Sequence, residues 1–187
     1  MLPQYLYDSL SKYIDIYTGK TPPNIEGMYL FSPVKLQYAS DGYNGDFYDC
    51  IMKFSKQSIR NICTYDEDQV VVKTHCDSAM IVGHDNLFTF VGKVTNVMND
   101  GRATSVMGTL ISGKKTESGI TDLSYAIYML EKYDPQHILM DVGTFRIFYD
   151  GDDLVQNYRG KYLPEKTILS NNNMTLNSMI AQKEEMP

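Results

Sequence analysis

The chain has 187 residues, 43% of them hydrophobic, and carries a formal net charge of −6 from 17 Lys and Arg against 23 Asp and Glu. This length suits a single domain with a sizeable core. The basic residues are scattered along the chain, which argues against nucleic acid or an anionic membrane surface as a partner. No stretch approaches the roughly 20 apolar residues of a transmembrane helix.

The N-terminal segment predicts an amphipathic helix over residues 3–17. Apolar side chains recur there at spacings of three and four, which places them on one face of a helix. This stripe consists of Leu6, Leu10, Tyr13, Ile14 and Tyr17. We expect the helix to pack on the rest of the domain. Gly19 suits its end, and Thr21-Pro22-Pro23-Asn24 predicts a stiff extended connector.

Residues 25–149 alternate between apolar and polar side chains, as in Tyr48-x-Cys50-x-Met52-x-Phe54. A period of two places successive side chains on opposite faces of a strand. Its repetition predicts a mostly antiparallel β structure with meander topology, because the connections are short. The expected strands are 25–31, 34–39, 47–55, 59–65, 69–76, 79–83, 86–94, 102–112, 122–132 and 143–149, and neighbouring candidates are short enough to merge.

Polar and glycine-bearing segments predict the turns. Asp41 to Asp46 is a long hairpin connection, Tyr65-Asp66-Glu67-Asp68 a polar turn, and Asn99-Asp100-Gly101 a tight hairpin. The alternation fades in a C-terminal extension, residues 154–187. Within it, residues 174–183 suit either a short helix or an unstructured tail. We found no interdomain linker, so residues 1–187 are expected to form one domain.

The three cysteines, Cys50, Cys63 and Cys76, each fall within or beside a candidate strand. Their spacing lacks the close pairs of zinc and redox sites. Buried free thiols are therefore expected, with one disulfide and one remaining thiol as the alternative.

Familiar catalytic and cofactor motifs are absent from the sequence. It contains neither a phosphate-binding glycine loop nor a Gly-x-Ser-x-Gly elbow, and its three histidines form no ligand-spaced pair. We therefore expect no cofactor, no metal and no catalytic residue. His75 or His84, with Asp77 and Asp85 nearby, is the one hint of an enzyme.

Three features together resemble the lipocalin-like, or calycin, β-barrels. A short N-terminal helix precedes Gly27-Met28-Tyr29, which is similar to the family's Gly-x-Trp signature with Tyr in place of Trp. Thr121-Asp122-x-x-Tyr125 resembles the Thr-Asp-x-Tyr-type turn between late strands. Arg146 resembles the late arginine that packs across the first-strand aromatic. The chain is also similar in style to mature bacterial secreted lipoproteins.

The resemblance implies an up-and-down barrel whose interior holds one small hydrophobic or amphipathic ligand, such as a lipid, without enzymatic chemistry. A barrel filled by its own side chains is the alternative. The expected ligand-binding residues are Phe88, Phe90, Tyr125, Ile127, Met129, Phe145 and Ile147. This assignment depends on strand register, because a slip of one residue reverses the two faces.

A second hypothesis is a surface module without a small ligand, built as a barrel or a β-sandwich, which recognises protein or glycan through its loops. Its candidate contact residues are Tyr43, Tyr65, Tyr133 and Tyr158. The resemblance favours an extracytoplasmic bacterial protein, in the periplasm or on the cell surface, in a mature form without its signal. Free cysteines favour a cytoplasmic location instead. The oligomeric state is left open.

Overall fold

The computed structural model describes residues 4–160 and confirms a mostly β fold with one short helix. Every pairing between the named strands is antiparallel. The elements are α1 (Gln4–Leu10), β1 (Gly27–Phe31), β2 (Val34–Ala39), β3 (Cys50–Ser55), β4 (Ile62–Gln69), β5 (Val72–His84), β6 (Leu87–Met98), β7 (Thr104–Lys115), β8 (Gly119–Tyr133), β9 (Phe145–Asp150) and β10 (Val155–Asn157).

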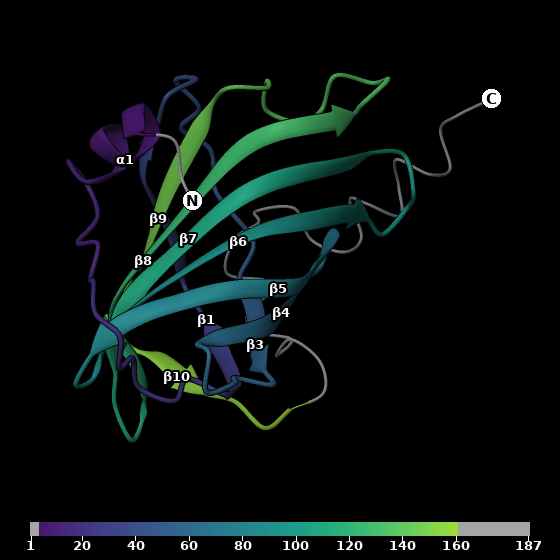
Figure 1. The fold of residues 1–187 in the computed structure, drawn as a ribbon. Coiled ribbons are helices and arrows are strands. Elements are labelled where there is room, and N and C mark those ends of the chain that lie inside the picture. The colour runs from purple at the N-terminus through teal and green to yellow at the C-terminus, as the bar shows by residue number, and fades with distance from the viewer. Residues whose placement is uncertain (1–3, 161–187) are drawn as a thin grey trace.

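The strands form one closed barrel with eight positions, compatible with a lipocalin-like fold. Strand β10 pairs with both β1 and β8, which closes the sheet. Strand β2 continues β1 beyond Ser32 and Pro33 and pairs with β9, the strand before β10. Ten strands therefore fill eight positions, because two positions each contain two strands in succession. Figure 1 shows the long strands β5 to β8 curving around the molecule.

Two predicted turns were wrong. The expected strands 69–76 and 79–83 merge into β5, as their length allowed, with a register shift between His75 and Met80. Residues 65–68, expected as a turn, lie within β4, where they pair with both β3 and β5. Thr121 and Asp122, expected at a turn, lie inside β8, and Asp122 adopts a positive φ of 51°. At residues 65–68 ladder hydrogen bonds outweigh the local turn preference of polar residues, whereas Asp122 lies at a register shift between β7 and β8.

One half of the barrel interior is filled by aromatic side chains. The rings of Tyr29, Phe54, Tyr65 and Phe90 contact one another at centroid distances from 5.0 to 6.0 Å, and all four are fully buried. The Tyr29 hydroxyl donates a hydrogen bond to the Ile25 carbonyl at 2.9 Å. Because Ile25 is also buried in this cluster, the segment before β1 covers this end of the barrel, called here the filled end.

The N-terminal segment forms a strap over the outside of the barrel. Leu6, Leu10 and Ile14 are buried in an outer cluster with Leu110, Ala126 and Ile147, and Figure 1 shows α1 beside β8 and β9. The sequence predicted a helix up to residue 17, but the helix ends at Leu10. Beyond it the barrel supplies hydrogen bonds that favour extended chain: Tyr17 N–H donates to Thr89 Oγ1 at 2.8 Å, and Ser112 Oγ donates to the Asp15 carbonyl at 2.6 Å.

The C-terminal extension begins with a strand that was not predicted, β10. Residues 161–187, including the candidate helix at 174–183, lie outside the described residues. Within residues 4–160, no helix is long and apolar enough to cross a membrane.

Candidate functional site

A cavity of about 180 Å³ occupies the other half of the barrel interior, called here the mouth half. It lies toward the loops 40–49, 69–72, 98–104 and 134–144, each of which borders it or contributes a lining residue. Most of its wall is apolar, formed by Phe31, Val34, Phe47, Val71, Val72, Met98, Ala103, Met107, Ile127, Leu139 and Phe148, with the ring of Tyr125.

The cavity exists because the inward side chains change character along the strands. On β4, the inward residues Cys63 and Tyr65 belong to the filled half, whereas Glu67 and Gln69 line the cavity. On β6, Phe90 packs in the filled half and Asn96 lines the cavity. On these two strands, aromatic rings fill one half of the barrel, while polar side chains line the cavity in the other.

Glu67 is the charged group at the floor of this cavity, and it is 4% exposed. Its Oε2 accepts hydrogen bonds from the Tyr65 hydroxyl at 2.5 Å and the Tyr125 hydroxyl at 2.9 Å. Its Oε1 accepts one from Gln69 Nε2 at 2.9 Å. Burial raises the pKa of Glu67, and these three hydrogen bonds oppose that rise. Burial and the nearby Glu67 raise the pKa of both tyrosines, which keeps them as hydrogen-bond donors.

A row of polar side chains crosses three neighbouring strands at the cavity wall. Thr74 Oγ1 on β5 donates to Asn96 Oδ1 on β6 at 2.6 Å, and Asn96 Nδ2 donates to Ser105 Oγ on β7 at 3.3 Å. All three side chains are buried. Together with Glu67 they give an otherwise apolar cavity a small set of hydrogen-bonding groups, which is the usual composition of a small-molecule site.

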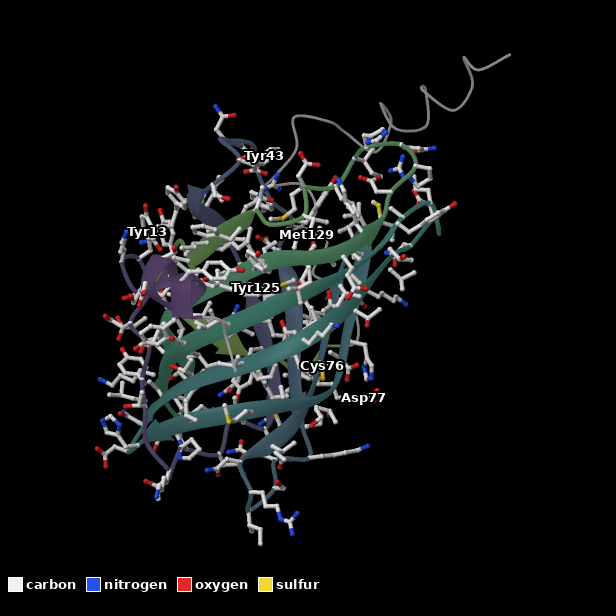
Figure 2. The ribbon with its side chains drawn as sticks, turned by 45° about the horizontal axis from the view of Figure 1, so that its top comes forward. Tyr13, Tyr43, Cys76, Asp77, Tyr125 and Met129 are labelled. Atoms are coloured by element: carbon white, nitrogen blue, oxygen red, sulfur yellow. The ribbon has the colours of Figure 1, made fainter. Side chains whose placement is uncertain are left out.

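The loop 40–49 covers the mouth. The Phe47 ring packs against the Phe148 ring at 4.5 Å and against the Tyr43 ring at 5.3 Å. The Arg146 guanidinium lies 4.2 Å from the Tyr43 ring centroid and forms an ion pair with Asp41 at 2.7 Å. Figure 2 shows Tyr43 at the top of the view, above Tyr125. These contacts hold the loop over the cavity.

The structure places five of the expected site residues on the inner face of the barrel. Tyr125 and Ile127 line the cavity, while Phe88 and Phe90 are buried in the filled half. Met129 alternates with Ile127 on β8 and is fully buried, but it does not belong to the cavity lining.

The expected inward orientation of Phe145 and Ile147 was wrong. Both belong to the outer cluster beneath the strap, and Phe148 lines the cavity instead. The outer face of β9 is also apolar because the strap covers it. Alternation alone therefore did not distinguish the two faces of this strand. Tyr65, expected in an exposed loop, is fully buried, whereas Tyr43 and Tyr133 are exposed.

Sequence reasoning missed Glu67 altogether. The period of two that would have found it does run through Cys63, Tyr65, Glu67 and Gln69. The run of acidic residues from Asp66 to Asp68 predicted a turn more strongly than this alternation predicted a strand.

Two features of the family resemblance have other surroundings than expected. Arg146 packs on the rings of Tyr43 and Phe47, and the cation above the Tyr29 ring is Lys115, whose Nζ lies 5.5 Å from the ring centroid.

His75, the hint of an enzyme, is exposed and lies away from the cavity lining. Its ring nitrogens are hydrogen-bonded to Asp66 at 2.6 Å and to Asp77 at 2.9 Å.

The three cysteines are buried and free, as predicted. Cys50 lines the cavity. Burial raises the pKa of its thiol, an effect that the nearby Glu67 and Asp49 reinforce, so the thiol is protonated and weakly nucleophilic.

Comparisons of the chain with protein-family models, curated proteins and solved structures found no match. The lipocalin-like description therefore rests on the strand number, the antiparallel pairing and the closure of the barrel.

Proposed function

We propose that the protein is a non-enzymatic binding protein that holds one small amphipathic molecule in the mouth half of its barrel. The observation that carries the proposal is the cavity of about 180 Å³ with an apolar wall and a polar floor. An apolar cavity of about 150 Å³ accommodates benzene, and sites for drug-sized ligands are about 300–1,000 Å³. The size favours a ligand with a single ring or a short chain over a sterol or a long fatty acid.

The covered mouth supports the same proposal. Phe47 contributes to both the cavity wall and the loop 40–49, so a ligand in the cavity would be enclosed by that loop. Enclosure removes apolar ligand surface from water, which provides the main part of the binding free energy. We further propose that the barrel is of the calycin type. We also propose that the protein acts outside the cytoplasm, and fractionation of cells that produce the full-length protein would test this location.

The experiment combines thermal unfolding with native mass spectrometry, using small aromatic compounds and short-chain alcohols, amines and acids. A ligand at a hundred times its Kd should stabilise the protein by about 2.7 kcal/mol. Ala103→Leu adds methylenes at a fully buried lining position and should abolish this effect. Val97→Leu, at an exposed position on neighbouring β6, is the control and should retain it.

Binding of no compound, or equal binding to the Ala103→Leu variant, would contradict the proposal. The melting temperature of each variant without ligand separates loss of binding from loss of stability.

A further inference from the structure

We propose that the ligand is a small organic cation, an ammonium group on a compact apolar body, whose charge is bound by Glu67 at the cavity floor. The inference rests on the proposed function and adds the chemical class of the ligand. Three features of the described residues carry it: the charge of Glu67, the unused hydrogen-bonding capacity around it, and the aromatic rings beside it.

Glu67 has neutral hydrogen-bond partners. Of the described residues that line the cavity, it alone carries a formal charge. Its partners, Tyr65, Tyr125 and Gln69, each donate a hydrogen bond to a carboxyl oxygen, an arrangement that fits the ionised form. A buried anion without a cation is energetically costly, and a ligand cation would offset that cost. An anionic ligand would instead be repelled.

The hydrogen-bonding geometry leaves an acceptor for such a cation. Among the described residues, Glu67 Oε2 accepts from two hydroxyls and Oε1 accepts only from Gln69, so Oε1 has a lone pair for an ammonium N–H. Further N–H groups have acceptors in the polar row of Thr74, Asn96 and Ser105, which lines the same cavity.

Aromatic rings line the cavity next to this carboxylate. The Phe31 and Tyr125 rings lie 6.3 Å apart, the Tyr125 and Phe148 rings 5.9 Å, and the Phe148 and Phe47 rings 4.5 Å. Aromatic faces attract cations, by about 2 kcal/mol or more where water is excluded. The combination of one buried carboxylate with several rings therefore selects for a positively charged group on an apolar body.

The test uses three probes with the same ring and different head groups: benzylammonium, benzyl alcohol and benzoate. Isothermal titration calorimetry at neutral pH should give benzylammonium an affinity at least about tenfold above that of benzyl alcohol, with benzoate weakest. A tenfold difference corresponds to about 1.4 kcal/mol. Glu67→Gln should remove the advantage of benzylammonium while changing the affinity for benzyl alcohol little. Glu131→Gln, at an exposed position paired with Lys93, is the matched control and should leave all three affinities unchanged.

The outcomes separate this inference from the proposed function. If benzyl alcohol or benzoate binds as tightly as benzylammonium, the inference is overturned and the proposed function stands. If none of the three probes binds, the inference is overturned, and the proposed function falls with it when the wider set of aromatic compounds, alcohols, amines and acids also fails to bind. The order of the three affinities in the unaltered protein decides the question even if Glu67→Gln fails to fold.

Discussion

Removing the Tyr65 hydroxyl tests the account of the cavity floor most directly. Tyr65→Phe deletes one oxygen and leaves the ring against Phe54 at 5.0 Å and Phe90 at 5.2 Å. The lost interaction is a buried hydrogen bond of 2.5 Å to Glu67. Hydrogen bonds to charged groups contribute about 1.5–3 kcal/mol, so we expect the free energy of unfolding to fall by that amount at about pH 8. The melting temperature should fall by about 3–12 °C.

The effect of this substitution should depend on pH. Burial raises the pKa of folded Glu67, and the Tyr65 hydroxyl opposes that rise. Since the pKa of folded Glu67 lies above its unfolded value, the stability contributed by its protonation is complete below the unfolded pKa and is lost as pH rises through the folded pKa. Without the hydroxyl the folded pKa rises further, so more stability is lost on reaching alkaline pH. The destabilisation should therefore be larger at about pH 8 than at about pH 4.

Urea unfolding at both pH values measures this difference. Tyr149→Phe, at an exposed position on β9, is the matched control and should change stability by less than about 0.5 kcal/mol. If Tyr65→Phe costs no more than this control, or costs the same at both pH values, then Glu67 is not an ionised acceptor at the cavity floor.

Two further substitutions test other parts of the molecule. Burial and the neighbouring Asp152 raise the pKa of Asp150 to about 7, so its contribution to stability is complete below the ordinary carboxyl pKa and is lost as pH rises through about 7. Asp150→Asn, which mimics the protonated form, should flatten this decline in thermal melts across that range, and parallel pH profiles would contradict the assignment. Leu10→Ala should lower the free energy of unfolding by roughly 2–5 kcal/mol in urea, because Leu10 belongs to the strap and is buried against the outside of the barrel. The exposed Lys12→Ala is its control, and an equal effect of the two would show that the strap adds no stability.

Alternation predicted the type of most elements because each strand buries one face consistently. Alternation was less informative about which face of each strand points into the barrel. On β8, Tyr125 points into the barrel and Ala126 toward the strap, and both are buried. The two faces of this strand look equally apolar in the sequence, since the strap that covers the outer face is distant along the chain. The inward face of β8 was assigned correctly, whereas that of β9 was reversed at Phe145 and Ile147.

The cavity floor was beyond sequence reasoning for a different reason. An acidic residue between two others predicts a solvent-exposed turn, because burial of a carboxylate is unfavourable on its own. What makes Glu67 acceptable inside is two tyrosines, one on the same strand and one 58 residues away on β8. Such compensation depends on three-dimensional proximity, which spacing along a single chain does not reveal.

Strand β10 gives the barrel a vulnerable seam. Three residues, Val155–Asn157, join β8 to β1 at the filled end, with two paired positions on each side. Were this short strand to detach, backbone donors and acceptors of Gly119, Ile120, Tyr29 and Leu30 would become open to strand addition from another chain. A variant that ends before Val155, and so lacks β10, should therefore self-associate while it still folds.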